Sequence, residues 1–422
     1  MTVDVNTLNG YFKRRYGELM DAIPSDGNTM CAQRIRFEEG RKIGDSYHED
    51  VRLGRSMGWT FAGGALAGTA YALNAARSGQ TQAASVAASS FVLREQIAYD
   101  VVSRAQNSMQ AFGKAFDDVV GDMTSSSHLA REVSLLYGQD DIGAIEVIAG
   151  AGTSRTWTMS KATSSAGLWW QLDGAALDSF DPTLVTQRNA NAEVAVTSID
   201  LDASGRVVVS VTGNAADLTA TLVGDVLVPL GANGNMMLGI AKIAKTTTGT
   251  LYGINVATFP LWKSTTHDAG TASATIATLM HALKVNRLKS GAGKRTAMVS
   301  TATWTDLNNN TTVLQRFLDS KQRSGVEYGT ESIAVENAQV SLEIVEHPLL
   351  KEGEAYIADY KKFKRIGSRD HSWNIGAPGQ QPRFFRELPD NAGFELRCYW
   401  DQGQLCRMPN CVTRIENLVN SV

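Results

Sequence analysis

A glycine-rich stretch at residues 290–296, SGAGKRT, is the strongest candidate in this sequence for a site that does chemistry. Glycines beside a lysine can cradle a phosphate group in backbone amides. The phosphate-loop pattern, however, needs glycine where Leu288 stands and serine or threonine where Arg295 stands. Such a loop also follows a strand and precedes a helix, whereas here a helical pattern precedes it and a strand-like run follows. We therefore expect a turn that ends a helix, and no nucleotide site.

The histidines and cysteines show no spacing typical of a metal site or a catalytic nucleophile. No HExxH, CxxC or GxSxG pattern occurs. The N-terminus carries no apolar segment typical of a signal peptide, so we expect free, packed thiols in a reducing compartment. We expect no catalytic residue, no cofactor and no bound metal. The residues concerned are His48, His128, His267, His281, His347, His371, Cys31, Cys398, Cys406 and Cys411.

Two acidic pairs, at residues 117–118 and 140–141, could in principle serve as general acids and bases. Adjacent side chains on a helix or turn point apart, so we expect both pairs to be solvated surface. Trp169 and Trp170 lie in a strand-like run, which would place their rings on opposite faces. One ring would then pack in the core and the other would contact a neighbouring subunit, in preference to forming a ligand platform.

The densest basic cluster comprises Lys361, Lys362, Lys364 and Arg365 around Phe363. On a strand, Lys362 and Lys364 would share one face, and the other three residues would share the opposite face. Two interpretations are open. The cluster contacts packaged phosphates or an acidic patch on a neighbour, or it is a solvated sheet edge protected by charge.

Bulk composition narrows the classes of protein. At 422 residues the chain is long enough for two or three domains with substantial cores. A formal net charge of −3 argues against a dedicated nucleic-acid binder. No apolar run reaches the roughly 20 residues that a membrane span needs, so we expect no membrane contact.

The longest periodic signal covers residues 100–139 and predicts a long helix. Steps of three and four residues place one polar and ten mainly apolar side chains on one face. Asp100 is a suitable N-cap, and Gly138 is a suitable left-handed residue after the last turn. Glycines and a serine run around Ser125 argue against a coiled coil and favour a rod, with a break at Ser125 as an open alternative. The stripe consists of Val102, Ala105, Met109, Phe112, Phe116, Val119, Met123, Ser126, Ala130, Val133 and Tyr137.

The segments before this helix have unusual compositions. Residues 6–23 predict an amphipathic helix, and residues 30–56 mix charges of both signs with few large apolar side chains. The second segment is either a solvated extended stretch or an arm that lies across a neighbouring subunit. Residues 63–90 are too poor in large side chains to build a core. They form either a disordered linker or a long projecting hairpin that is ordered by another molecule, with strand-like flanks at 59–61 and 91–97.

Short β-rich runs separated by turn residues follow the long helix and favour a sandwich or small barrel. We predict strands at 144–149, 155–159, 168–172, 194–201, 207–212, 218–223, 226–230, 238–245 and 251–259. Helical periodicity returns at 273–288, 301–307 and 312–318, with a strand at 297–299. The last strands are predicted at 341–345, 355–359, 363–366, 394–400 and 412–415.

Taken in order, these features resemble a tailed-bacteriophage major capsid protein, an α+β fold shared with encapsulins. Residues 59–63 look like the outgoing leg of that family's extended loop, and residues 97–100 look like its return into the spine helix. Residues 136–139 resemble the end of the spine. Residues 342–359 resemble the family's late strands, and residues 394–407 resemble its terminal hairpin.

The resemblance implies a domain plan. Residues 1–50 would be an N-terminal arm, 51–99 the extended hairpin loop, 100–142 the spine helix of the peripheral domain, and 143–270 a β-rich region. Residues 271–335 would form helices and a strand of the axial domain, and 336–422 a strand-rich return through both domains. Extra strands between 194 and 259 suggest an inserted β-domain with a turn at Gly224 and Asp225. The loop contains no lysine between Lys42 and Lys114, which argues against the lysine-to-asparagine cross-link of some family members.

The implied function is structural. Many copies would assemble in the host cytoplasm into the icosahedral capsid of a virion, with hexamers and pentamers around double-stranded DNA. A scaffolding protein, a portal, a decoration protein and nonspecific contact with packaged DNA would be the partners. The alternatives are an encapsulin-like compartment shell, a nucleotide-binding enzyme at Lys294 and an extracellular adhesin. We predict assembly contacts at Phe12, Arg34, Arg36, Trp59, Phe61, Phe91, Lys361, Lys362, Lys364 and Arg365.

Overall fold

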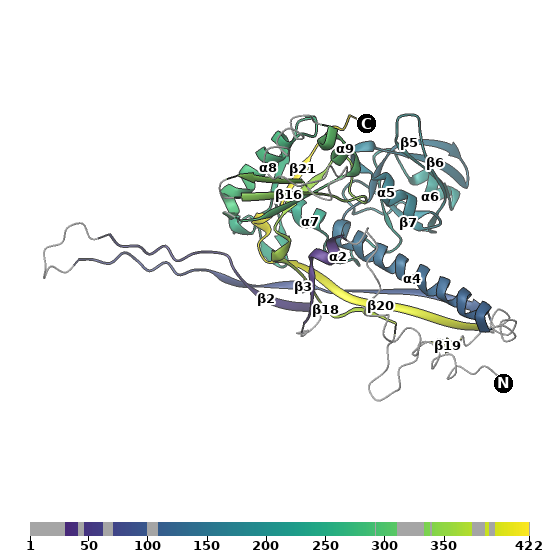
Figure 1. The fold of residues 1–422 in the computed structure, drawn as a ribbon, viewed down its shortest axis with the longest axis horizontal. Coiled ribbons are helices and arrows are strands. Elements are labelled where there is room, and N and C mark those ends of the chain that lie inside the picture. Colours follow the sequence, from purple (N-terminus) through teal and green to yellow (C-terminus); the bar gives the residue numbers. More distant parts are fainter. Residues whose placement is uncertain are drawn as a thin grey trace, which may run out of the picture.

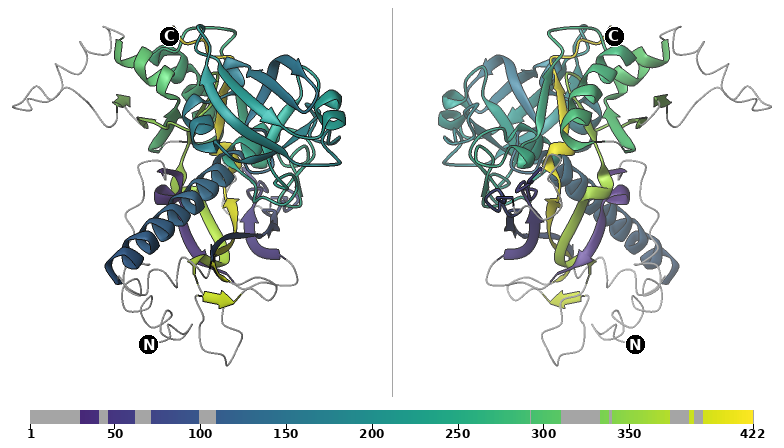
Figure 2. Two further views of the ribbon diagram at one scale, coloured as in Figure 1. Left: turned by 90° about the vertical axis from the view of Figure 1, so that its right-hand side faces the viewer. Right: turned by 90° about the vertical axis from the view of Figure 1, so that its left-hand side faces the viewer.

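The computed structural model describes residues 30–40, 46–61, 71–98, 109–291, 293–309, 333–337, 340–373, 385–387 and 393–421. The fold is α+β, with a long projecting hairpin, a sheet that carries one long helix, a β-barrel and a second sheet covered by helices (Figure 1). The barrel and the helix-covered sheet lie side by side above the long helix (Figure 2). The helices predicted at 6–23 and 312–318, and residues 100–108 of the long helix, lie outside the described residues.

The long helix is α4, Met109–Tyr137, which is continuous through Ser125 and about 44 Å long. Its buried side chains include Met123 and Ser127, and Ser127 accepts a contact from the thiol of Cys398. The helix therefore packs on a late strand of its own chain, as the stripe predicted, although Ser126 of that stripe is exposed.

The predicted end of this helix was wrong in one detail, because Gln139 and not Gly138 has the left-handed conformation, with φ 59°. Gly138 serves close packing instead. A Cβ atom there would lie 1.9 Å from the carbonyl oxygen of Met237.

A five-stranded sheet lies beneath α4 and is organised around β20, Gly393–Cys406. This strand pairs antiparallel with β4 (Ser89–Ala98), β18 (Phe363–Ser372) and β19 (Phe385–Glu387). β1, Arg36–Glu39, adds to β18 in parallel. The predicted terminal hairpin at 394–407 is therefore wrong. Those residues form one continuous strand up to Cys406, because partners from distant parts of the chain supply its hydrogen bonds.

The segment from residue 30 to residue 53 belongs to the core of its own subunit in its described parts. In α2, Met30–Arg34, and just after it, Cys31 and Ile35 are fully buried. β2, Ser46–Arg52, buries Tyr47 and Val51 on one face. The first predicted alternative, a solvated stretch, is wrong for these residues. The second, an arm across a neighbour, stays a prediction for the exposed side chains of the segment, such as Arg36. The charged side chains of the segment misled the prediction because several of them pair with charges of the sheet.

β2 pairs with β3, Thr81–Ala87, and begins the projecting hairpin of Figure 1. Beyond this ladder the two legs, residues 53–61 and 71–80, stay together through sparse bonds. The amide of Leu53 donates to Gln80 O at 2.8 Å, and the amide of Met57 donates to Arg77 O at 3.0 Å. Near the described tip, Asn74 Nδ2 donates to Trp59 O at 2.8 Å. The hairpin prediction is confirmed for these residues, although 59–61 is extended chain without a regular ladder.

Six strands close into a barrel in the order β10-β5-β6-β9-β8-β7, which confirms the small-barrel prediction. Trp157 and Leu227 are among its fully buried residues, and the expected turn at Gly224 and Asp225 precedes β10. The strands are β5 (Gly143–Ala151), β6 (Ser154–Met159), β7 (Ala176–Phe180), β8 (Val194–Leu201), β9 (Val207–Thr212) and β10 (Val226–Pro229).

Three predicted strands are helices. Residues 168–172 fall in α5 (Ala166–Trp169) and the 3-10 helix η3 (Trp170–Leu172), 218–223 overlaps α6 (Ala215–Ala220), and 238–245 overlaps α7 (Ile240–Lys245). The periodicity of a short apolar run does not distinguish a helix from a strand. In α6 the side chain of the N-cap residue Asn214 accepts a hydrogen bond from the Ala216 amide, which favours the helix. Trp169 is nevertheless buried and Trp170 exposed, since neighbours on a helix also point apart.

The second sheet has the order β13-β21-β17-β14-β16-β15 and is covered by α8 (Ile276–Ser290) and α9 (Thr301–Asn309). α8 ends at Gly291, φ 79°, so the predicted helix-ending turn is confirmed. Among the described residues, no helix is both long and apolar enough to cross a membrane. The strands are β13 (Thr265–Asp268), β14 (Arg295–Val299), β15 (Ile333–Asn337), β16 (Val340–Glu346), β17 (Ala355–Ala358) and β21 (Thr413–Glu416). The short elements are β11 (Thr250–Leu251), β12 (Ile254–Asn255), η2 (Lys161–Thr163), η4 (Pro260–Trp262), η5 (Tyr360–Lys362) and η6 (Pro409–Cys411).

Candidate assembly surface

The distal half of the hairpin exposes large apolar side chains. Trp59 is 64% exposed, Phe61 86% and Leu73 78%, and Met57 and Tyr71 are also exposed. The rings of Trp59 and Phe61 meet edge to face, with centroids 6.4 Å apart. A two-stranded hairpin has no second layer on which to bury such side chains. Several large apolar side chains exposed on one element are typical of a site that another molecule covers.

Beyond Asp50, the charged side chains of the hairpin are all arginines. Arg52, Arg55 and Arg77 lie on its legs, and the sequence contains no acidic residue between Asp50 and Glu95. Arg52 Nε donates to Gly54 O at 3.3 Å, and Arg55 is exposed. A surface that covers this hairpin should therefore offer apolar area together with carboxylates or carbonyl oxygens.

Of the other predicted contact residues, Arg36 is exposed on the edge strand β1, and Phe12 lies outside the described residues. Arg34 pairs with Glu343 at 3.3 Å, which ties α2 to β16. Phe91 stacks on Trp400 with ring centroids 4.8 Å apart. Arg34 and Phe91 thus have partners within the subunit, and Arg36, Trp59 and Phe61 face outward.

The basic cluster consists of two exposed residues, Lys361 and Lys362, and two buried residues, Lys364 and Arg365. Lys361 and Lys362 are exposed in η5, and β18 begins only at Phe363, so the predicted alternation along one strand is wrong. Lys364 is buried against Glu38 and Glu49. Arg365 is buried too, where it pairs with Asp370 and donates to Ile35 O at 3.0 Å. The interpretation as a solvated edge therefore fails for these two, because they hold β1 and β2 against the sheet.

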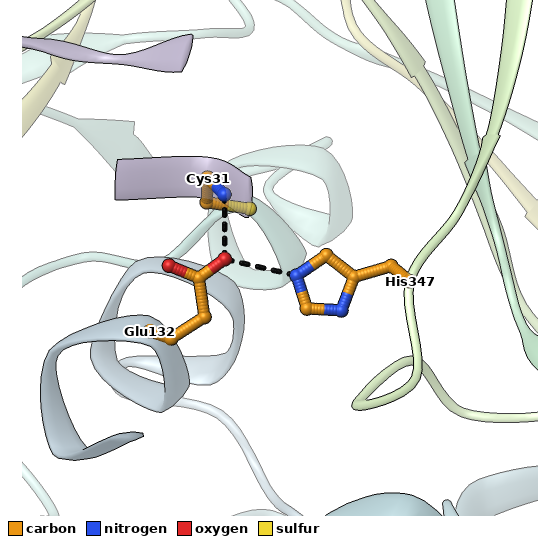
Figure 3. Close-up of side chains that lie close together, drawn as sticks. All are labelled: Cys31, Glu132 and His347. Atoms are coloured by element: carbon orange, nitrogen blue, oxygen red, sulfur yellow. Dashed lines mark hydrogen bonds and ion pairs between the residues drawn. The ribbon is translucent and has the colours of Figure 1, made fainter. Parts of the chain in front are cut away.

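Three fully buried polar side chains meet where α2, α4 and the end of β16 come together (Figure 3). Glu132 Oε1 accepts from the Cys31 amide at 2.5 Å and lies 2.9 Å from His347 Nε2. Its Oε2 accepts from the Ala32 amide at 3.1 Å. Glu132 thus joins three distant segments, and we call this group the Glu132 node.

The ligand atoms of Cys31, Glu132 and His347 lie within 4.8 Å of one another, a spacing that could suit a metal ion. The Leu349 amide, however, donates to His347 Nδ1 at 3.2 Å. This bond fixes the tautomer with its proton on Nε2, so Nε2 donates to Glu132 and has no lone pair for a metal. Burial and the neighbouring Glu132 raise the pKa of the Cys31 thiol well above its ordinary value, which leaves it a weak nucleophile. The node is a hydrogen-bonded joint.

The acidic pair after α4 forms a second joint, and the prediction that it is solvated surface was wrong. Lys351 Nζ lies 2.5 Å from Asp141 Oδ1, and Lys245 Nζ lies 2.6 Å from Asp140 Oδ2. Lys351 is almost completely buried, over the ring of Tyr137. Burial opposes ionisation of Asp141, but Lys351 and Lys245 outweigh it and hold the pKa of that carboxyl well below its ordinary value. The pair therefore fastens the end of α4 to α7 and to the connection between β16 and β17.

Comparison with known proteins gives no match to any family model and none to a curated protein sequence. Among solved structures, the capsid asymmetric unit of cyanophage A-1(L) is similar, with a TM-score of 0.50 and 11% identity over 93% of each chain. The chain has the fold of a phage capsid subunit. The capsid of a native GTA particle gives a TM-score of 0.46 at 8% identity over 93% of this chain and 91% of that one. A structure from Mycobacterium phage Adephagia gives 0.44 at 9% identity over all of both chains.

We call α4 the spine helix, and residues 46–61 with 71–87 the extended loop, after the segments that the sequence resemblance implied. The four cysteines are buried free thiols, as the sequence predicted. Sequence reasoning missed the Glu132 node and the lysine partners of Asp140 and Asp141. No local pattern marks them, since Glu132 and His347 are 215 residues apart.

Proposed function

We propose that this protein is a major capsid protein, many copies of which assemble into an icosahedral shell around double-stranded DNA. One observation carries the proposal: a chain with a capsid-subunit fold extends a hairpin whose large apolar side chains have no cover in the subunit. Covering that hairpin on a neighbour would contribute interface area of the kind that obligate oligomers use, above about 2,000 Å². The role is structural.

Noncovalent overlap holds the shell together in this proposal, because the extended loop lacks a lysine for a cross-link. Trp59, Phe61 and Arg36 contact neighbouring subunits, and Lys361 and Lys362 supply exposed charge for packaged DNA or for an acidic neighbour. A scaffolding protein, a portal and a decoration protein complete assembly in the host cytoplasm.

The test is assembly of the purified protein, followed by sedimentation and negative-stain microscopy. We expect closed shells, and hexamers or pentamers before closure. A compact 45.5 kDa monomer under every assembly condition would contradict the proposal. Shells that enclose a protein cargo in place of DNA would favour an encapsulin-like compartment. The surroundings of Lys294 give the nucleotide-binding alternative no support, since this residue follows a helix-ending turn and pairs with Glu343 at 3.2 Å.

A further inference from the structure

Four lysines gather at one end of the second sheet. The pairing directions place the starts of β13, β21 and β14 at the same edge as the end of β17. One lysine precedes β13, one lies in the last turn of α8, and two follow β17 in η5. The topology thus brings charges together from three separate parts of the chain. We call this group the lysine end, which consists of Lys263, Lys289, Lys361 and Lys362.

Two lysines of this group lie beside each other. Lys289 Nζ donates to Thr265 Oγ1 at 2.8 Å. Lys263 has an extended backbone two residues before Thr265, which places both side chains on one face. Partial burial and the positive charge of Lys263 lower the pKa of Lys289 from its ordinary value. The two ammonium groups repel each other, and an anion beside them would offset that repulsion.

The segment between β20 and β21 joins this pair to the lysines of η5. Asn410 Nδ2 donates to Lys289 O at 3.3 Å, and the Arg407 amide donates to Lys362 O at 3.0 Å. Both Lys361 and Lys362 are exposed. The four side chains therefore belong to neighbouring segments of one surface.

Carboxylates near the lysine end are already paired with other cations. Within the part of the chain that the structure describes, none of them forms an ion pair with a lysine of this group. The pairs are Asp359 with Arg295, Glu343 with Arg34 and Lys294, and Glu49 with Lys364 and Arg407. The subunit thus leaves the four charges of the lysine end without a counter-charge of its own.

We propose that the lysine end binds the phosphate backbone of double-stranded DNA. DNA carries one negative charge per roughly 1.7 Å of its axis, so lysines spread over a sheet end can each meet a phosphate. An acidic side chain of a protein offers only one charge. Ammonium groups contact phosphates without reading base sequence, as enclosed DNA of any sequence requires. The inference rests on the proposed function, because it takes the DNA inside the shell as the ligand. In a closed shell, the lysine end would then face the interior.

The test is a titration of the unassembled protein against a short labelled DNA duplex, read by fluorescence anisotropy. Affinity should fall steeply from about 50 to about 200 mM salt, because each phosphate contact releases counterions. Lys289→Gln keeps a donor for Thr265 but removes the charge. At about 50 mM salt it should weaken binding by about 15-fold, and it should reduce the slope of log affinity against log salt by about one. Lys263→Gln should do the same.

Lys284→Gln is the matched control. It removes one charge from an exposed lysine of the same helix, about 140° around the axis from Lys289, and should leave the affinity and the slope nearly unchanged. Equal losses in Lys284→Gln and Lys289→Gln would overturn the lysine end, since net charge alone would then explain binding. Thermal unfolding shows that each variant is folded.

Two further measurements decide the case without any change beside Thr265. The double substitution Lys361→Gln, Lys362→Gln alters only exposed side chains and should reduce the salt slope by about two. Polyglutamate should compete poorly with DNA, and preferential binding of polyglutamate would overturn the proposal in favour of an acidic protein partner. Subunits that assemble into shells but show no affinity for DNA at low salt would overturn the lysine end alone. A failure of assembly would leave the titration of unassembled protein unaffected.

Discussion

The extended loop and the C-terminal end of the spine helix differ in how far their side chains are covered within the subunit. Trp59, Phe61 and Leu73 stand in solvent on a two-stranded hairpin held by sparse backbone bonds. At the spine end, residues 131–138 are buried all round, and even charged groups such as Glu132 have their partners within the subunit. One region leaves its apolar surface uncovered, and the other leaves almost no polar group unmatched.

This difference separates what folds the subunit from what would assemble it. Damage at the spine end should unfold the subunit, because buried polar groups would lose their partners. Damage on the hairpin should leave the folded subunit intact, since nothing in it depends on those side chains. Variants in the two regions should therefore affect different measurements.

The largest effect is expected at the Glu132 node. Glu132→Ala would leave the Cys31 and Ala32 amides and His347 Nε2 without an acceptor, so we expect a loss of about 3–5 kcal/mol in the free energy of unfolding. Denaturant titration measures it. Asp122→Ala, on an exposed position of the same helix, should change stability by no more than about 0.5 kcal/mol. If the two substitutions lowered the free energy of unfolding equally, the hydrogen bonds of the Glu132 node would not stabilise the subunit.

Next in size is the hairpin. The double substitution Trp59→Ser, Phe61→Ser should leave thermal unfolding unchanged and raise the protein concentration needed for assembly by about 100-fold. The loss corresponds to about 3 kcal/mol of apolar burial on a neighbour. Light scattering against concentration gives the threshold. Trp170→Ser, which removes an exposed tryptophan from the barrel region, is the matched control. An unchanged threshold in the double variant would remove the hairpin from the assembly contacts.

Two glycines, one within the spine helix and one directly after it, should respond to the same substitution in opposite ways. Gly138→Ala would force its Cβ against the backbone beside Met237, so we expect a loss of about 2 kcal/mol in stability. Gly121 has open space at the Cβ position. Gly121→Ala should therefore stabilise the helix by about 0.5–1 kcal/mol. Thermal unfolding of the two variants should shift in opposite directions, and a shift in the same direction would contradict the packing at Gly138.

The smallest effect on folding is expected at η5. Lys361→Ala with Lys362→Ala should change the free energy of unfolding by less than about 0.5 kcal/mol, because both side chains are solvated. Lys364→Ala, two residues further on, would remove a buried cation that pairs with both Glu38 and Glu49 and should cost more, although Arg407 still pairs with Glu49. Denaturant titration compares the two. If the double variant and Lys364→Ala lost the same stability, the buried and the exposed lysines of the cluster would contribute equally to folding, contrary to this prediction.

The sequence predicted the elements that carry strong local signals. The spine, β4, β14 and β17 have long periodic or β-branched patterns, and the core-poor composition of residues 63–90 indicated the hairpin. α6 and α7 were missed because six-residue apolar runs fit helix and strand equally well. The Glu132 node could not be found, since its partners come together only when three distant segments pack. Asp140 and Asp141 were misjudged for the same reason, as Lys245 and Lys351 lie far along the chain.

The position of β20 has a consequence for synthesis. This strand receives hydrogen bonds from β4, β18 and β19, yet it lies in the last tenth of the chain. β4 leaves the ribosome near the end of the first quarter, and must wait roughly 15–60 seconds for its partner at ordinary elongation rates. Until then its edge is unpaired and the base of the hairpin has no sheet to rest on. Nascent chains should therefore be the form most dependent on chaperones, and only completed subunits should be competent to join a shell.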